Sequence, residues 1–327
     1  RHEFVIPERR LAVDVSIGVV ISDQLEEDVE SLMVKADLAI YAAKGNGKAT
    51  VVQFHDSMDT QYQHRQQLKG DLRDAIANGQ IFLAYQAIHD PRSNRIVGCE
   101  ALARWNHPVH GLISPQVFIP IAEESGVITD LTRRVLSIAT RDCSTWPGAL
   151  AVAVNLSARD FRNGDVAAMV GDALAAAGLP AARLVVEVTE TTVIEERAVA
   201  IAALSALKAR GVGVALDDFG TGYSSLSYLR ALPLTKLKID RSFVVDIETN
   251  PQALRMLANV AQLGKDIDLT ITVEGVETPS QVDLLLASTR IDHIQGFVYG
   301  PPLTLASMTS LLSAQEAPSG AAIDNQA

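Results

Sequence analysis

From residue 81 onward, short apolar segments alternate with longer amphipathic ones, and this alternation constrains the fold more than any other feature of the sequence. Strands that are apolar on both faces are typical of a parallel sheet covered by helices. Eight such strands are predicted, at residues 81–88, 96–104, 150–156, 183–188, 213–217, 236–239, 269–273 and 291–294. Eight strand-helix units within about 230 residues favour an α/β fold of the TIM-like (β/α)8 barrel type over an open, doubly wound sheet.

Helix start signals support this reading of the segments between the strands. Asn250 followed by Pro251 is a favourable beginning for one helix. Thr278, with Pro279 next and Gln281 three residues on, has the pattern of a capping box for another.

A smaller α/β segment is predicted before the barrel. Residues 11–20 alternate as a strand, residues 26–44 have the spacing of a helix, and residues 49–54 form a second strand. This piece is too short for a complete domain, and the chain begins with Arg1. We therefore expect it to be the end of a domain that starts further upstream.

Two further segments complete the predicted organisation. Leu68, Leu72 and Ile76 recur every four residues in a polar stretch, which predicts an amphipathic linker helix. The final residues are mostly small or polar, which predicts a disordered tail. The expected boundaries are an α/β segment at 1–55, a linker helix at 56–79, a barrel at 80–313 and a tail at 314–327.

Composition excludes several classes of partner. A net charge of -11 and a pI near 5.1 argue against binding to duplex nucleic acid or to an anionic membrane surface. Cys99 and Cys143 are the two cysteines, and their spacing indicates neither a disulfide framework nor a zinc site. Without a long uncharged apolar run, we expect a cytoplasmic location, with a sensory domain or membrane anchor left to a longer parent protein.

Polar side chains follow the apolar strands at the edge where a barrel assembles its active site. They are Glu100, Asn155, Glu187, Asp217, Asp218, Lys238, Glu274 and Gln295. One such acid is usually a helix cap, but five carboxylates at one rim would repel one another unless cations neutralised them. Oxygen ligands select Mg²⁺ or Mn²⁺, and two such ions are a known device for phosphodiester hydrolysis. A glycosidase is the alternative from this pattern alone, although it explains neither the lysine nor the excess of acids.

The segment from Asp217 to Leu226 contains two acids followed by Gly220 and Gly222. An ordinary strand-to-helix turn needs neither two acids nor so long a loop. We therefore predict a mobile loop that couples metal binding to substrate or dimer contacts.

Taken together, these motifs resemble the EAL-domain cyclic di-GMP phosphodiesterases over about residues 80–305. The matching motifs are Glu100-Ala101-Leu102, Asn155-Leu156-Ser157, Glu187-Val188-Thr189-Glu190, Asp217-Asp218-Phe219-Gly220, Lys238-Ile239-Asp240, Glu274-Gly275-Val276-Glu277 and Gln295-Gly296. Their order along the chain is that of the family, so the resemblance is specific.

The resemblance implies a role for each matching position. The implied ligands of one metal ion are Glu100, Asn155, Glu187 and Asp217. Those of the second ion are Asp217, Asp218 and Glu274. The implied catalytic residues are Lys238, which would hold the attacking water, with Glu100, Glu274 and the loop-bracing Glu190. The residues implied in substrate binding are Gln86, Leu102, Arg104, Asp240, Glu277 and Gln295.

The same resemblance implies a substrate and partners. Cyclic di-GMP would be cleaved to linear pGpG with two Mg²⁺ or Mn²⁺ ions, and barrels of this family commonly pair into homodimers. Residues 11–54 look like the closing third of a GGDEF domain whose signature motif is absent from this chain. Cyclase activity is therefore not expected of it.

Two alternative functions fit the residues less well. A catalytically silent cyclic di-GMP receptor or a regulatory interaction module would need neither Lys238 nor the acids of the second metal ion. His107 and His110 have a spacing that suits chelation, but they lie in a turn without a third nitrogen or sulfur ligand. Residues 44–48 lack the spacing of a phosphate-binding P-loop.

Overall fold

The computed structural model describes residues 2–6, 9–22, 28–45, 50–220 and 226–316. The chain divides into two compact units, Arg1–Arg73 and Asp74–Ala327. Within the described residues, no helix has the length and apolar character needed to cross a membrane.

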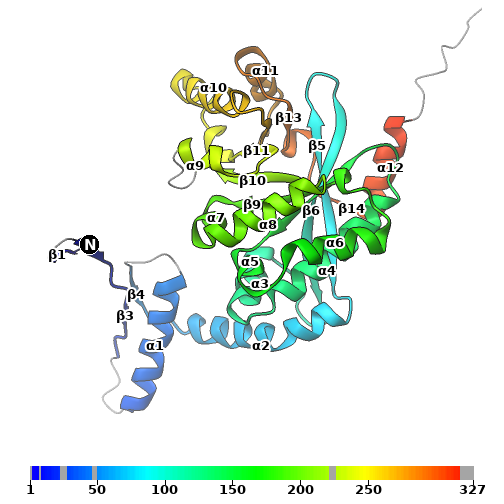
Figure 1. The fold of residues 1–327 in the computed structure, drawn as a ribbon. Coiled ribbons are helices and arrows are strands. Elements are labelled where there is room, and N and C mark those ends of the chain that lie inside the picture. The colour runs from blue at the N-terminus through cyan, green and yellow to red at the C-terminus, as the bar shows by residue number, and fades with distance from the viewer. Residues whose placement is uncertain (1, 7–8, 23–27, 46–49, 221–225, 317–327) are drawn as a thin grey trace, which may run out of the picture. The chain divides into compact units, whose positions relative to one another are not determined.

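The first unit contains two small sheets and a helix (Figure 1). Its elements are β1 (His2–Ile6), β2 (Arg9–Val13), β3 (Ile17–Val19), α1 (Val29–Gly45), β4 (Val51–Gln53) and the beginning of α2 (Ser57–Ala77). β1 and β2 form an antiparallel hairpin, whereas β3 and β4 pair in parallel across the helical connection. A β-carbon at Gly18 would lie 2.5 Å from the backbone nitrogen of Ile40, so glycine lets β3 pack closely on α1.

The strand predicted at residues 11–20 is interrupted in the structure. β2 ends at Val13 and β3 begins at Ile17. The predicted helix at 26–44 corresponds to α1, and the predicted strand at 49–54 to β4. The assignment of this unit to a GGDEF domain stays a prediction.

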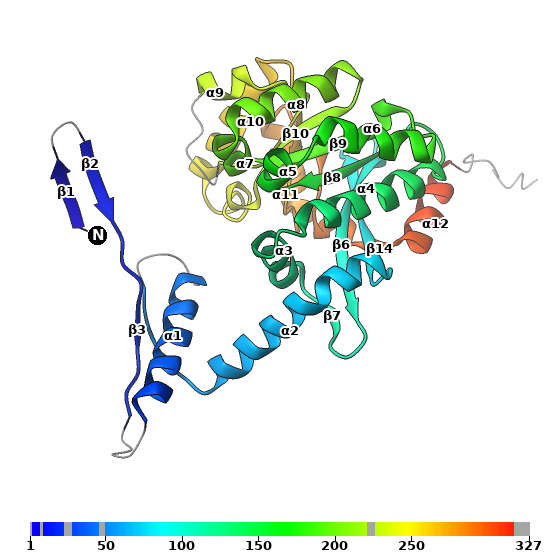
Figure 2. The ribbon, with the colours of Figure 1, turned by 60° about the horizontal axis from the view of Figure 1, so that its bottom comes forward.

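The second unit is a closed barrel of eight strands with helices on its outside (Figures 1 and 2). The barrel strands are β5 (Ile81–Asp90), β6 (Arg95–His107), β8 (Ala151–Leu156), β9 (Leu184–Thr189), β10 (Gly213–Phe219), β11 (Lys236–Ile239), β12 (Thr270–Val273) and β13 (His293–Ile294). Two short strands of the same sheet are β7 (Gly111–Ile113) and β14 (Leu303–Thr304). All eight predicted strands are present, and β7 and β14 add short pairs at the margins. The predicted TIM-like barrel is therefore confirmed.

The helices and 3₁₀ turns connect the strands and cover the barrel. They are α3 (Pro115–Glu124), α4 (Ile128–Ser144), α5 (Ala158–Asn163), α6 (Val166–Ala177), η1 (Ala181–Arg183), α7 (Glu190–Glu195), α8 (Arg197–Ala209), α9 (Leu226–Ala231), η2 (Arg241–Phe243), α10 (Pro251–Lys265), α11 (Pro279–Ser288), η3 (Phe297–Tyr299) and α12 (Leu305–Glu316). Asn250 caps α10, and Thr278 forms a capping box with Gln281 at the start of α11, as predicted.

One of the eight barrel strands runs against the other seven, which corrects the prediction of a parallel sheet. β5 pairs antiparallel with β6 on one side and with β13 on the other. The four residues 91–94 between β5 and β6 form a tight turn. A parallel pair needs a crossover of about a dozen residues. A four-residue connection therefore permits only an antiparallel hairpin.

The polar residues of the predicted site lie inside their strands more often than at the ends. β6 continues for seven residues beyond Glu100, to His107, and β9 extends beyond Glu187 to Thr189. Beneath them, Ala153, Val185 and Ala215 form a buried apolar layer. Because alternate residues of a strand face the same side, Glu187 stands above Val185, and Asp217 above Ala215, in the barrel interior.

The C-terminal helix passes the predicted end of the barrel. α12 ends at Glu316, so residues 314–316, which the sequence placed in the tail, are helical. Residues 317–327, which hold the rest of the predicted tail, lie outside the described part of the chain.

Candidate active site

A bulge in β10 brings two neighbouring acids into one site. The register between β10 and β11 shifts between Leu216 and Phe219. Asp218 within this bulge has a φ of 53°, in the left-handed region that aspartate tolerates better than most residues. Consecutive residues of a regular strand point to opposite faces, and a bulge changes that direction. As a result, both Asp217 and Asp218 have an oxygen within 4.8 Å of the carboxylate of Glu274.

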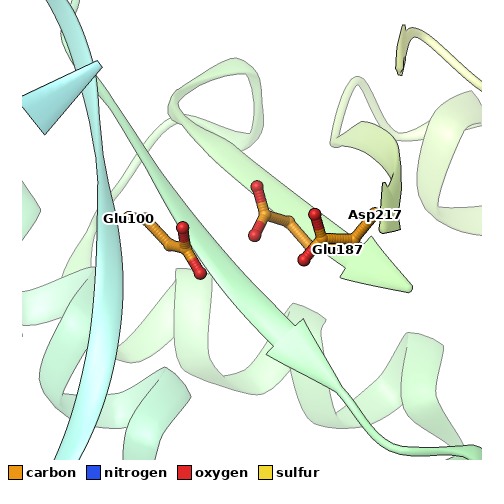
Figure 3. A group of neighbouring side chains, drawn as sticks. All are labelled: Glu100, Glu187 and Asp217. Atoms are coloured by element: carbon orange, nitrogen blue, oxygen red, sulfur yellow. The ribbon is translucent and has the colours of Figure 1, made fainter. Parts of the chain in front are cut away.

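Two groups of carboxylates share Asp217. Oxygens of Glu100, Glu187 and Asp217 all lie within 4.8 Å of one another, and Figure 3 shows these three side chains arising from separate strands. Asp217, Asp218 and Glu274 form the second group with the same spacing. Each group therefore has the composition and size to hold a metal ion, and one carboxylate belongs to both.

Lys238 lies fully buried among these acids. Its Nζ atom is 2.8 Å from Glu187 Oε2, 2.8 Å from Glu274 Oε1, 3.0 Å from Asp217 Oδ1 and 3.3 Å from Glu100 Oε2. One ammonium group thus faces four carboxylates, and their full ionisation would leave three negative charges uncompensated in a buried site.

The pKa values reflect this excess of acids. Burial raises the pKa of Glu187 well above its ordinary value and that of Glu274 to about 8, with Lys238 only partly opposing the effect. Burial alone would lower the pKa of Lys238, but the surrounding carboxylates raise it well above its ordinary value. Burial and the charge of Asp217 raise the pKa of Asp218. The carboxylates therefore favour either protons or added cations.

Glu100 behaves differently because amides hold its charge. Burial acts to raise the pKa of Glu100, but Lys238 and hydrogen bonds lower it overall. Asn155 Nδ2 donates to Glu100 Oε1 at 2.8 Å, and Gln295 Nε2 donates to Glu100 Oε2 at 2.7 Å. The Gln295 amide also lies 3.3 Å from Gln86 Oε1. These amides fix the orientation of one carboxylate.

An open cleft of about 330 Å³ lies above the carboxylates. It is lined by Gln86, Glu100, Asp217, Asp218, Arg241, Glu274, Gly275, Glu277, Gln295, Gly296 and Phe297. A β-carbon at Gly296 would come within 2.0 Å of the carbonyl oxygen of Val276, so glycine is required where the two loops at this wall meet.

Two residues whose side chains line this cleft, Arg241 and Phe297, were not identified from the sequence. Arg241 pairs with Glu277 at 3.3 Å, and its side-chain stem packs over Gly275. Phe297 is 63% exposed at the cleft wall. The available signals were their positions, because Arg241 follows Asp240 and Phe297 follows Gly296 in motifs already singled out.

Some predicted site residues lie outside the cleft lining. Leu102 and Arg104 share the face of β6 that carries Glu100, by the alternation of the strand. The guanidinium of Arg104 donates to the carbonyl of Ala103, and its pKa is lowered by burial despite the charge of Glu100. Asp240 accepts the amide of Ser242 and so caps η2.

Glu190 belongs to neither carboxylate group. It is buried at the start of α7, and among the described residues neither of its carboxylate oxygens has a hydrogen-bond partner. The loop that the sequence assigned it to brace includes residues 221–225, which lie outside the described residues. Its bracing role and the predicted loop mobility therefore stay predictions.

The histidine pair of the sequence is part of a turn. His107 Nδ1 accepts hydrogen bonds from the backbone amides of Val109 and His110, each at 3.1 Å. That nitrogen is occupied by the backbone, which supports the turn over chelation. In the candidate phosphate loop, residues 46–48 lie outside the described part of the chain.

Comparison with known proteins gives consistent matches. The chain is 37% identical over 306 residues to the bifunctional diguanylate cyclase/cyclic di-GMP phosphodiesterase MucR of Pseudomonas aeruginosa, covering 92% of this chain and 44% of the relative. The first curated relatives are matched over only 36–44% of their own length. This chain therefore corresponds to a part of each of those proteins.

Solved structures match the barrel. The PaMucR phosphodiesterase in complex with c-di-GMP superimposes with a TM-score of 0.70 at 38% identity, covering 74% of this chain and 99% of the other. The calcium/cy-diGMP complex of Klebsiella pneumoniae BlrP1 superimposes with a TM-score of 0.61 at 33% identity, covering 68% and 56%.

The family assignment follows from the extent of the match. The family model described as "EAL domain" matches residues 69–302, well over half of the chain and all of the carboxylate cluster. This chain belongs to the EAL domain family.

Proposed function

We propose that this chain is a metal-dependent phosphodiesterase that hydrolyses cyclic di-GMP to linear pGpG. The observation that carries the proposal is the pair of carboxylate groups that share Asp217 and surround the buried Lys238. A protein that only bound the nucleotide would have no need for so many mutually repelling acids beside a buried lysine.

The donor set fits two hard divalent ions. All candidate ligands are oxygens, which favours Mg²⁺ or Mn²⁺ over zinc. One ion would be held by Glu100, Asn155, Glu187 and Asp217. The other would be held by Asp217, Asp218 and Glu274. When bound, such ions neutralise the carboxylates and lower the pKa of a coordinated water.

The chain's own residues would position the reactants. Lys238 would hold the attacking water by hydrogen bonding, because its ammonium contacts members of both carboxylate groups. Gln295 and Asn155 fix Glu100 in the orientation that the site needs. Arg241 and Arg104 would supply cationic groups for the two phosphates of the substrate.

The substrate is suggested by the relatives. MucR is described as a cyclic di-GMP phosphodiesterase, and its domain was solved with c-di-GMP. BlrP1 was solved with the same nucleotide and calcium. A match at 38% identity over nearly the whole of that solved domain supports the same nucleotide here.

The test is turnover of cyclic di-GMP with Mg²⁺ or Mn²⁺, followed by separation of the linear product. Glu100→Ala should abolish turnover, because it removes a proposed ligand of the first metal ion and the acceptor of two amide hydrogen bonds. Nucleotide binding in Ca²⁺ without turnover in Mg²⁺ or Mn²⁺ would instead identify a silent receptor. Absence of both would leave a regulatory interaction module.

Three further expectations stay predictions. They are a homodimer formed through the barrel, a sensory domain upstream in a longer parent protein, and a cytoplasmic location. Light scattering of the purified chain checks the first of these.

A further inference from the structure

A second lysine lies inside the barrel below the carboxylates. Lys236 precedes Lys238 by two residues on β11, so both side chains face the barrel interior. Its backbone pairs with Ala215 of β10 and with Thr270 of β12. Lys236 therefore lies one layer below Lys238 on the inner wall.

Both lysines line the same small cavity. Glu187 and Thr272 form its polar part, and small residues leave the space open on the opposite side. The small residues are Gly98, Ala151 and Ala153. The cavity volume of about 20 Å³ suffices for one water molecule. Lys236 therefore shares a water-sized cavity with Glu187, a member of the carboxylate cluster.

No acid neutralises Lys236 directly. Among the described residues, its ammonium group has neither a hydrogen-bond partner nor an ion pair, whereas Lys265 pairs with Asp292 and Lys208 donates to the carbonyl of Leu234. Burial lowers the pKa of Lys236 from its ordinary 10.5, and the charge of Glu187 opposes that change. Lys236 is half-buried, and the charge of Asp292 also acts on it, so its positive charge reaches Glu187 with partial screening.

We infer that Lys236 is a built-in counter-cation that weakens the binding of divalent metal ions to the group formed by Glu100, Glu187 and Asp217. A positive charge beneath the ligands offsets part of the carboxylate repulsion before metal arrives, and it repels the metal once bound. Lys236 therefore tunes metal affinity through Glu187 without touching the substrate. The inference rests on the proposed metal-dependent function and concerns the same site.

The experiment measures the affinity for Mg²⁺ alone, without nucleotide, by titration calorimetry and thermal shift. Lys236→Met and Lys236→Gln both remove the charge, and Met also keeps the length of the side chain. Each should bind Mg²⁺ more tightly, by about three- to ten-fold. The measurement is made at the same neutral pH for every variant, because protons compete with the metal for the carboxylates. Lys208→Met, which removes the same charge from an exposed helix position, should bind Mg²⁺ as the unmodified chain does.

Substrate turnover provides the second readout. Both Lys236 variants should reach half-maximal activity at a lower Mg²⁺ concentration than the unmodified chain, by the same factor as the change in affinity. A purely structural role would lower the melting temperature without changing this metal dependence.

Unchanged or weaker Mg²⁺ binding in both Lys236 variants would overturn the inference. Failure of the proposed function gives a different pattern, in which the unmodified chain binds Mg²⁺ but does not cleave cyclic di-GMP. The affinity measurement then still decides the role of Lys236, because it needs no turnover.

Discussion

The two ends of the barrel use cations in opposite ways. At the end where the parallel strands begin, Arg183 donates to the carbonyls of Leu150 at 2.8 Å, Cys143 at 2.8 Å and Trp146 at 3.3 Å. Where the strands end, one ammonium, that of Lys238, faces four carboxylates. At the first end one cation satisfies three carbonyls, whereas the second end leaves an excess of negative charge.

This difference separates stability from chemistry within one fold. Polar groups that are fully paired contribute to stability, and their loss leaves buried carbonyls without donors. Like charges gathered in a buried site cost stability and become useful when a cation or substrate joins them. Removal of a cation should therefore impair folding at one end and catalysis at the other.

The largest expected effect concerns Lys238. Lys238→Ala should lower kcat for cyclic di-GMP by about 10³-fold, because the residue that holds the attacking water is lost. Metal and nucleotide binding, measured in Ca²⁺, should be largely retained. Lys208→Ala, which removes a lysine from the opposite end, should leave kcat unchanged. Loss of metal binding in the Lys238 variant would contradict the water-holding role.

A large but different effect is expected for Arg183. Arg183→Met should lower the free energy of unfolding by about 2 kcal/mol, because three carbonyls lose a charged donor. Chemical denaturation measures this change, and kcat should stay within two-fold of the unmodified value, roughly the noise expected for sites that do not interact. Arg133→Met serves as the matched control, because its ion pair with Asp130 is exposed and contributes less than about 0.5 kcal/mol.

The pH dependence of the metal-free chain gives a smaller effect. Glu274 has a pKa of about 8 when folded and an ordinary value of 4.5. The pKa of Glu187 is also raised. Between these values the folded state binds more protons than the unfolded state, so stability falls as pH rises through this window. Melting curves in a chelator should show a melting temperature that falls from pH 5 to about 8.

Added Mg²⁺ sharpens that test. The ion replaces the protons on the carboxylates, so its stabilising effect should grow as pH rises. A melting temperature that rises with pH in the chelator would show that the carboxylates do not repel one another as the geometry indicates.

The smallest effect is expected at the mouth of the cleft. Arg241 and Glu277 are 63% and 45% exposed, and their ion pair is well solvated. Glu277→Gln should therefore change the free energy of unfolding by less than about 0.5 kcal/mol. A loss comparable to that of Arg183→Met, in the same denaturation experiment, would place this pair among the structural contacts.

Much of the barrel could be predicted because its signals are local. Each strand is a short apolar run, and helix caps such as Thr278 and Asn250 follow simple rules. The carboxylate cluster could be predicted because a barrel collects the residues that follow its strands. Glu100, Glu187, Asp217 and the others come together because of topology, which the strand count already indicated.

The features that the sequence analysis missed depend on how strands and loops lie next to one another in the folded chain. The direction of β5 is set by a four-residue turn, which the strand count alone does not weigh. In the sequence, Lys236 looks like an ordinary strand residue. It lies inside the barrel because it is two residues from Lys238 on the same strand. Phe297 and Arg241 become site residues only when their loops meet beside Gly296 and Gly275. The meeting of these loops joins distant segments of the chain, so no short-range pattern carries that information.

The hydrogen bonds of Gln295 join the last barrel strand, β13, to β5 and β6 at the beginning of the barrel. Gln86 and Glu100 are cross-strand neighbours on the β5–β6 hairpin, and Gln295 directly follows β13. β13 itself meets β5 through a single register pair, His89 with Ile294. Site residues thus contribute to the closure of the cylinder, so a metal ion bound at the site should stabilise the junction of β13 with β5. Slower hydrogen exchange of the β13 amides on adding Mg²⁺ is the expected sign, and an unchanged rate would exclude it.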